Sequence, residues 1–537
     1  MLVAVAAGGL LVVLSDVDTD RATAVSTWHV APWGDDENAG TLDAPLATVA
    51  AAVDRSVSGD TIELRGGVYH ESVEVNGVGV TIRSRDGERA VFDGAVPVEG
   101  FRPVGERWVH DRWTRQFERE PSGGPVGADH IVAGYPDQVF LDGRPLTQVL
   151  QLVEVGPGTF FHDTEADQLW LGDDPAWSLV EASRYRFGFV FRDAGGSVLE
   201  NITVRRFATE ARDMAAVRAY TDDISIIGVE VSSNARMGIS AIGVGIRVVD
   251  SRILDNGYIG VHAERASSFV LERSAVLRNN REDFDPFHSG AGVKLTRSSG
   301  VTIRENDISW NRGPGLWTDL DTRLVTIVRN LIEGNRRAGI EIELSSEVNV
   351  LSNVSLDNGE AGIWVLESQN VQVLHNASFG NVNGIEVEEG PRREVRDVRI
   401  MNNTLGDPAP GTRALLDVND WTEERSATEM GVTIDYNAYW LAPDQRGDAL
   451  SRWGQWPDGL VLSNDLSQHQ AATGQGRNSR VQREEQNPFA RSPFAGDYRG
   501  FDWLVVGAPV TGSAASQLGI PPGGQRRIGP VAPVERR

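Results

Sequence analysis

The chain has 537 residues, enough for one very large or several ordinary domains, and its 58 glycines indicate many turns. It contains no cysteine, which excludes a disulfide framework, a thiol nucleophile and a thiolate metal site. A net charge of −25 repels phosphate backbones and anionic lipid head groups. Nucleic acids and membrane surfaces are therefore not expected as partners.

The N-terminal segment has the pattern of a leader. Residues 1–14 form an apolar run that is too short to span a bilayer. No basic residue precedes the run, but Ala22-Thr23-Ala24 is a candidate cleavage site. We therefore predict that residues 1–26 are a signal peptide and linker, and that the mature protein is secreted without a membrane association.

Residues 27–180 contain two different patterns. Residues 27–100 are expected to form the entrance of the main fold, with strands at 28–30 and 59–64 and a capping helix near 45–56. Residues 101–180 lose the repeat described next and carry many aromatic side chains, which indicates a small β-rich insertion.

Residues 181–440 repeat, with a glycine followed by an apolar residue once per period. The steps are 22–24 residues, apart from one step of 32. The pairs are Gly238-Ile239, Gly260-Val261, Gly292-Val293, Gly315-Leu316, Gly339-Ile340, Gly362-Ile363 and Gly384-Ile385. Two asparagine tracks keep the same phase: Asn306, Asn330, Asn353 and Asn376, then Asn311, Asn335, Asn358 and Asn381.

Short alternating strands with stacked asparagines at this period are typical of a parallel β-helix. Leucine-rich repeats share the period, but their leucine spacing and helical segment are absent. The sequence therefore predicts an all-β chain whose main coil is a right-handed parallel β-helix. Residues 441–537 are expected to pack along the coil or to cap its open end, because an uncovered terminal coil exposes strand edges.

The step of 32 residues marks a lengthened turn just before Gly292, and such a turn commonly serves a site. Asp283, Asp285 and His288 lie in it. They are expected to bind substrate hydroxyl groups or, for the two aspartates, a calcium ion. A solvated loop without a ligand is the alternative interpretation.

Strand alternation places every second side chain outside the coil. Counting from each glycine gives two outward columns. The first is Ser240, His262, Lys294, Trp317, Glu341, Trp364 and Glu386, and the second is Ile242, Glu264, Thr296, Asp319, Glu343, Leu366 and Glu388.

Asp319 and Glu343 share the second column on adjacent coils. Neighbouring strands lie ~4.8 Å apart, so the two carboxyl groups are expected about 5 Å from each other. Retaining glycosidases use a similar separation, with one carboxylate as nucleophile and the other as acid and then base. Two carboxyl groups this close do not both ionise freely, so we expect Glu343 to hold a proton. A solvated acidic face is the alternative.

Lys294 is the only lysine among 51 basic residues, and it falls in the first column beside Trp317. A compact ammonium group there is expected to act as a charge partner of Asp319 or as a base. Trp317 and Trp364 are expected to stack on sugar rings. Further substrate contacts are assigned to Glu341, Asp321, His262, Glu264 and His288.

Two stretches, Gly313-Pro314-Gly315-Leu316-Trp317-Thr318-Asp319 and Gly339-Ile340-Glu341-Ile342-Glu343-Leu344-Ser345, resemble secreted bacterial β-helix enzymes of the pectate-lyase-like type. Among these, the chain is similar to glycoside hydrolase family 120, the β-xylosidases. The resemblance implies that Asp319 of the Trp-x-Asp segment is the nucleophile and that Glu343 is the acid/base. The family motif has an aromatic residue after the nucleophile, where this chain has Leu320.

Three functions follow as hypotheses. The first is a secreted extracellular glycoside hydrolase that cleaves a neutral, plant-type oligo- or polysaccharide by double displacement and requires no cofactor. The second is a polysaccharide lyase or uronate epimerase with Lys294 as base and calcium on Asp283, Asp285 or Asp319, which the acidic surface disfavours. The third is a non-catalytic glycan-binding solenoid with aromatic platforms.

Overall fold

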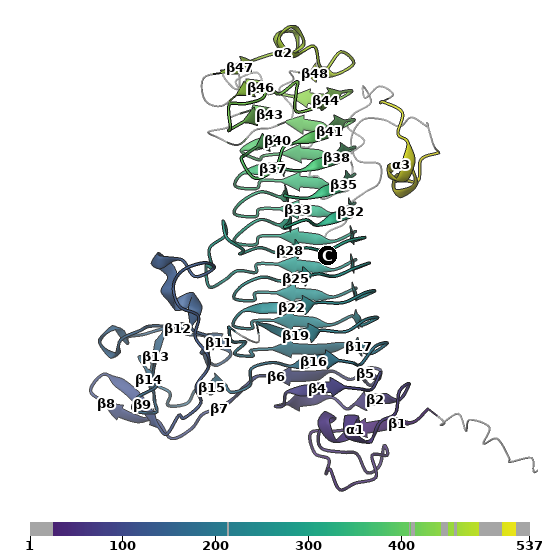
Figure 1. Cartoon of the computed structure of the whole chain (residues 1–537). Helices are drawn as coiled ribbons and strands as arrows, with labels where there is room; N and C mark the ends of the chain where they lie inside the picture. The colour runs from purple at the N-terminus through teal and green to yellow at the C-terminus, as the bar shows by residue number, and fades with distance from the viewer. Residues whose placement is uncertain are drawn as a thin grey trace, which may run out of the picture.

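The computed structural model describes residues 25–211, 214–406, 409, 414–441, 449–455, 459–482 and 507–521. The first 24 residues of the predicted leader lie outside this range. The chain winds into a long coil whose walls are three sheets of 13 strands each (Figure 1). The predicted all-β parallel coil is confirmed. Across the described ranges, the molecule contains no helix long and apolar enough to cross a bilayer.

Sheet A forms one wall of the coil, and its described strands pair in parallel. Its strands, in spatial order, are β1 (Thr27–Val30), β2 (Thr61–Leu64), β5 (Thr81–Ser84), β17 (Val198–Glu200), β20 (Ser225–Ile227), β23 (Arg247–Val249), β26 (Val270–Glu272), β29 (Thr302–Arg304), β32 (Arg323–Val328), β35 (Ser346–Leu351), β38 (Gln369–Leu374), β41 (Arg396–Met401) and β44 (Val432–Asp435).

Sheet B forms the second wall. Its strands are β3 (Gly67–Tyr69), β6 (Ala90–Asp93), β18 (Ile202–Arg205), β21 (Glu230–Ser232), β24 (Arg252–Leu254), β27 (Ala275–Leu277), β30 (Asp307–Ser309), β33 (Leu331–Glu333), β36 (Val354–Leu356), β39 (Ala377–Phe379), β42 (Thr404–Gly406), β45 (Ala438–Trp440) and β48 (Arg480–Gln482).

Sheet C forms the third wall and carries the outward columns. Its strands are β4 (Val73–Asn76), β16 (Phe189–Arg192), β19 (Ala215–Ala219), β22 (Met237–Ala241), β25 (Val261–Glu264), β28 (Val293–Thr296), β31 (Leu316–Asp319), β34 (Ile340–Glu343), β37 (Ala361–Leu366), β40 (Asn383–Glu389), β43 (Ala414–Asp420), β46 (Ala449–Gln455) and β47 (Gly459–Ser463). The last pair, β46 and β47, is antiparallel.

Two short sheets form the insertion, which leaves the coil after β6 and returns before β16 (Figure 1). Its strands are β7 (Ala95–Pro97), β8 (Arg102–Val104), β9 (Arg107–Asp111), β10 (Val139–Leu141), β11 (Arg144–Pro145), β12 (Thr147–Gln148), β13 (Thr159–Asp163), β14 (Gln168–Leu171) and β15 (Val180–Ser183), with 3-10 turns η1 (Ala128–Gly134) and η2 (Leu152–Glu154). The coil continues across it without a break, because β4 pairs with β16 and β6 with β18.

Helices lie at the two ends and along one side. The N-terminal helix α1 (Val49–Arg55) falls within the predicted range, and its first turn is capped by the hydroxyl of Thr48. At the other end, α2 (Leu466–Thr473) packs on β46 and β47. Helix α3 (Gly512–Leu518) lies against the side of the coil (Figure 1). Its Leu518 packs in one apolar cluster with Leu351 of β35. The described C-terminal residues thus both cap the coil and run along it.

The interior of the coil is filled from all three sheets by inward-facing apolar side chains. The two asparagine tracks form buried ladders against this core. Asn330, for example, accepts hydrogen bonds on its Oδ1 from the backbone and side chain of Asn306. Its own backbone N–H and side-chain amide each donate to Oδ1 of Asn353 at 2.9 Å. Each ladder satisfies backbone N–H groups at a corner of the coil, where no sheet partner is available.

The glycine column is confirmed as a stack at one strand edge. A Cβ built on Gly292, Gly315 or Gly339 would meet the carbonyl oxygen of the glycine one coil further at 2.7 Å. The side-chain amide nitrogen of a ladder asparagine would lie at a similar distance from the same Cβ. Only glycine therefore fits where the coil passes beside its asparagine ladder.

Candidate active site on sheet C

Three adjacent strands of sheet C bring the predicted catalytic residues together. The parallel register pairs Lys294 of β28 with Trp317 of β31, and Trp317 with Glu341 of β34. The last residue of β31 is Asp319 and that of β34 is Glu343, so the same register places these two residues side by side. Directly after these two residues the chain turns toward sheet A through left-handed corners at Leu320 (φ 51°) and Leu344 (φ 44°). The predicted columns are thus real features of the coil.

The predicted exposure of this face is wrong. Lys294 is 5% exposed, Trp317 3% and Glu341 2%, while Asp319 and Glu343 keep 7% each. Residues from turns contact these side chains from outside the coil: His288 of the turn before β28 contacts Lys294, Arg337 contacts Glu341, and Arg392 of the turn after β40 contacts Glu343. In particular, Trp317 does not offer a free indole face for stacking on a sugar, and Lys294 does not occupy an exposed position.

Lys294 makes three contacts that together explain a lysine at this position. Its Nζ lies 3.3 Å from Oδ2 of Asp319 and donates to the carbonyl of His288 at 3.2 Å. The same ammonium group lies 3.2 Å from the centroid of the Trp317 ring, a cation–π contact. Burial lowers the pKa of Lys294 from its usual value, and the neighbouring carboxylates, Asp319 first, oppose that shift. A planar guanidinium group could not make these contacts from one point.

Trp317 and Arg392 hold the Glu343 carboxyl group from two sides. The indole Nε1–H of Trp317 donates to Oε2 of Glu343 at 3.0 Å. Nη2 of Arg392 lies 2.5 Å from the other oxygen, Oε1. The indole that was expected to bind sugar therefore orients the candidate acid/base.

Glu341 is the carboxyl group of the site whose pKa is raised. Burial raises the pKa of Glu341 to about 8, with smaller increases from Glu343 and Glu360, while Arg337 and Lys294 act in the opposite direction. Nη1 of Arg337 lies 3.3 Å from Oε2 of Glu341. At neutral pH this carboxyl group is therefore largely protonated. The expected protonation of Glu343 by the charge of Asp319 remains a prediction.

The lengthened turn of residues 281–290 covers one side of the site and is held by the insertion. The backbone N–H of Asp285 donates to the carbonyl of Pro125 at 2.9 Å. Phe284 is fully buried, with its ring centroid 4.2 Å from that of Tyr258. The exposed ring of Phe287 lies over the guanidinium group of Arg337 at 4.2 Å. The turn and the insertion thus form one wall of the site.

The structure gives no support to calcium in this turn. The Asp283 carboxylate is paired with Arg312 at 2.9 Å and with Arg336 at 3.1 Å, and Asp285 Oδ1 accepts the N–H of Phe287. Within the described part of the chain, no three acidic, histidine or cysteine side chains are grouped as metal ligands.

Three further candidates lie at the margins of the site. His262 is partly buried and contacts the Thr296 hydroxyl at 3.2 Å, and burial, with the charges of Lys294 and Arg297, lowers the pKa of His262 to about 4. Glu264 is paired with Arg297 at 3.2 Å. His288 contributes its backbone carbonyl to Lys294, while its side chain is exposed.

Two candidates come from the strand and corner regions that follow β31 and β34 along the chain. Asp321 is exposed and paired with Arg393. Trp364 is partly buried, and its ring centroid lies 5.6 Å from the Arg337 guanidinium. Trp364 is therefore the tryptophan of the first column that keeps accessible surface for a sugar.

Sequence reasoning missed the two arginines that neutralise the glutamates. Arg337 bridges Glu341 and Glu360, and Arg392 reaches Glu343. A signal existed for Arg392, because its turn makes the step from Asn376 to Asn403 27 residues long instead of 23. Arg337 lies in a turn of ordinary length and carries no such signal.

Comparisons with known proteins agree with the coil. A family model described as a right-handed β-helix region matches residues 215–378. Pectate lyase PEL9 of Emericella nidulans is 38% identical over 73 residues, which are 12% of this chain and 18% of that protein. The uncharacterized protein YwoF of Bacillus subtilis strain 168 is 35% identical over 71 residues, 12% of this chain and 15% of that protein. The chain thus aligns with less than a fifth of either relative.

Among solved structures, a complex of XylC with xylose matches with a TM-score of 0.69 at 15% sequence identity. The match covers 95% of this chain and 99% of that one, so it includes the insertion and the C-terminal part as well as the coil. The observed coil, its parallel register and these matches identify the chain as a right-handed parallel β-helix protein.

Proposed function

We propose that the protein is a retaining glycoside hydrolase that acts on a neutral glycan. The observation that carries the proposal is the placement of Asp319 and Glu343 at matching outward positions of adjacent coils, each with a small accessible edge. One strand spacing, ~4.8 Å, is close to the roughly 5–5.5 Å that separates nucleophile and acid/base in retaining enzymes.

The surrounding contacts suit these two roles. In the proposed first step, Asp319 attacks the anomeric carbon while Glu343 protonates the leaving oxygen, and in the second step Glu343 deprotonates the attacking water. Lys294 places its Nζ 3.3 Å from Oδ2 of Asp319, and an ammonium group at this distance favours the anionic nucleophile. Trp317 fixes one oxygen of Glu343 by its hydrogen bond.

The substrate proposal is a xylose-type neutral sugar. It is supported by the resemblance of the Trp317–Asp319 and Glu343 segments to the β-xylosidases, and by the likeness of the whole chain to a protein solved with xylose. The charges at the centre agree, because Asp319 and Glu343 each have their own cation, while the raised pKa of Glu341 leaves that group largely protonated. The proposed leader would place this activity outside the cell.

The proposal is tested by anomeric outcome and by two alanine variants. When the hydrolysis of aryl xylosides is followed by proton NMR, the first product to appear should be the anomer with the same configuration as the substrate. Asp319→Ala should lower turnover of every substrate by about 10⁴-fold or more, since no covalent intermediate can form. Glu343→Ala should spare aryl glycosides with good leaving groups far more than natural glycosides. Inversion of configuration, or near-normal turnover by Asp319→Ala, would show that these carboxylates are not the catalytic pair.

The lowered pKa of Lys294 favours one alternative, a lyase or epimerase in which an uncharged lysine abstracts the proton α to a uronate carboxylate. That reaction predicts unsaturated uronides, detectable by their ultraviolet absorbance, or a change in uronate configuration. A panel of neutral and uronic-acid glycans, followed by reducing ends and by absorbance, separates the two functions.

A further inference from the structure

A second lengthened turn, residues 390–395 between β40 and β41, reaches back across two coils to the site. Gly390 and Arg393 form an antiparallel bridge, so the turn is a tight hairpin. From it Arg392 extends to Glu343 of β34, while Arg393 extends to Asp321. Arg392 is half-exposed, and it is the cation in contact with the proposed acid/base.

Glu367 fixes Arg392 in this position. The backbone N–H of Arg392 donates to Oε1 of Glu367 at 2.8 Å, and the guanidinium group of Arg392 contacts the other oxygen. Glu367 itself is 1% exposed. A Cβ on Gly390 would lie 2.6 Å from Oε1 of Glu367, so glycine is what lets the turn close over this carboxylate. A buried anion thus holds both the backbone and the side chain of Arg392.

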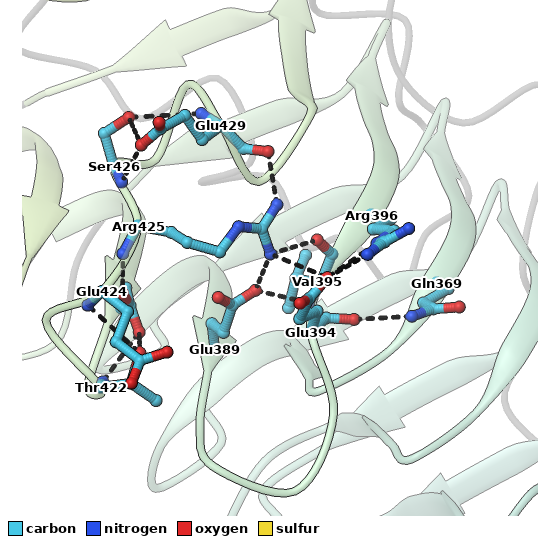
Figure 2. Close-up of polar contacts among 11 residues, drawn as sticks. Gln369, Glu389, Glu394, Val395, Arg396, Thr422, Glu424, Arg425, Ser426 and Glu429 are labelled. Carbon is cyan, nitrogen blue, oxygen red and sulfur yellow. Dashed lines mark hydrogen bonds and ion pairs between the residues drawn. The ribbon is translucent and has the colours of Figure 1, made fainter.

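The base of the same turn is clamped by Arg425 (Figure 2). Nη1 of Arg425 lies 2.5 Å from Oε2 of Glu389 and donates to the carbonyl of Val395 at 3.2 Å. Oε2 of Glu389 also accepts the N–H of Val395 at 2.6 Å. Glu389 precedes the turn and Val395 is its last residue, so the clamp joins the two ends of the turn and limits its movement relative to sheet C.

We propose that Arg392 is a positioning residue that holds the Glu343 carboxyl group in its Trp317-bonded orientation and sets the pH at which this group takes up a proton. A guanidinium group at this distance favours the carboxylate, and its fixed attachment means that little reorganisation is needed. The other charged groups near Glu343 are Glu341 on the same strand, Lys294 and Asp319 on the two preceding strands, and Glu367 behind Arg392. The catalytic consequence of this proposal rests on the proposed function, whereas the coupling between Arg392 and Glu343 does not.

The indole N–H of Trp317 provides a readout that needs no substrate, because it donates directly to Glu343. Its signal is followed by ¹⁵N TROSY spectra of the full chain between pH 4 and pH 8 and assigned by its absence in Trp317→Phe. In Arg392→Gln the midpoint of the titration should move up by about one pH unit, since the carboxylate loses its cation. Arg393→Gln is the matched control from the same turn and should leave the midpoint unchanged.

Arg392→Lys guards against misfolding of the glutamine variant, because it keeps a charge on the same exposed turn and should give a smaller upward shift. An unchanged midpoint in Arg392→Gln, or an equal shift in Arg393→Gln, would overturn the proposal. If the enzyme hydrolyses neutral glycosides, the alkaline limb of kcat/KM should move upward in parallel with the midpoint. If the wild-type protein cleaves none of them, the proposed function fails while the titration still decides the coupling.

Discussion

At the scale of single residues, each carboxyl group of the site lies beside a separate basic side chain. Lys294 contacts Asp319, Arg337 contacts Glu341 and Arg392 contacts Glu343, and all three carboxyl groups are at most 7% exposed. Removing one partner from a buried pair leaves an uncompensated charge, which is costly. Substitutions within this set therefore affect both stability and chemistry.

Lys294→Arg tests the need for an ammonium group. The longer planar cation cannot contact Asp319, the His288 carbonyl and the Trp317 face from one point, so kcat/KM should fall by about 100-fold. Because Lys294 is buried, the variant should also lose about 1–3 kcal/mol of stability by overpacking. Steady-state kinetics and thermal melting measure both effects. The converse substitution Arg297→Lys, at a more exposed ion pair, is the control, and unaltered kinetics in Lys294→Arg would contradict the assigned role.

Glu341→Gln tests the protonated carboxyl group. The pKa of Glu341 rises from an ordinary 4.5 in the unfolded chain to about 8 in the fold, so the native state binds the extra proton between these values. The free energy of unfolding should therefore fall as pH rises from 4.5 to 8, by about 2–4 kcal/mol from this group. Glutamine mimics the protonated form and should remove that part of the slope while keeping most of the activity near neutral pH. Melting curves at several pH values, with Glu264→Gln as control, give the comparison, and an unchanged slope would refute the protonated state.

At the scale of elements, the glycine column determines how closely successive coils approach at the strand edge that leads into the site. Gly339→Ala would bring a Cβ to 2.3 Å from the Ser355 hydroxyl and 2.7 Å from the Gly362 carbonyl. Because backbone on the next coil cannot yield easily, we expect a loss of about 2–4 kcal/mol. Gly127, whose Cβ would meet nothing within 4 Å, is the control, and Gly127→Ala should be nearly neutral. Equal denaturant midpoints for the two variants would exclude a steric role for the column.

The sequence was sufficient to predict the coil and its columns, because period, glycine and asparagine all follow from contacts between adjacent coils. The register of Lys294, Trp317 and Glu341 could be counted directly from those glycines. Burial could not be predicted in the same way. The groups that cover the columns, such as Arg392, come from turns two coils away, and the turn before Gly292 is held by Pro125 of the insertion. Such contacts depend on loop paths that leave no periodic signal.

At the scale of the whole molecule, the insertion and the coil act together although the chain separates them. The coil passes from β6 to β18 as if the insertion were absent, yet the insertion supports the 281–290 turn over Lys294. The buried side chain of Arg236 on the coil joins the two parts, through an ion pair with Glu120 of the insertion and a cation–π contact with Phe284 at 4.8 Å. The coil thus supplies the chemistry-bearing columns, and the insertion helps to supply their cover.

The coil also fixes the spacing between the outward side chains of successive strands. Asp319 and Glu343 stand on neighbouring strands, so the separation of their backbone positions changes only in whole steps of ~4.8 Å. Duplication of one complete coil between β31 and β34 would reproduce the asparagine and glycine contacts at each new coil boundary but set the carboxylates about 9–10 Å apart, at the upper end of the separations that inverting glycosidases use. In a β-helix with such a carboxylate pair, a change from retention to inversion would thus require the gain or loss of a whole coil. Gradual changes in a loop would not produce it.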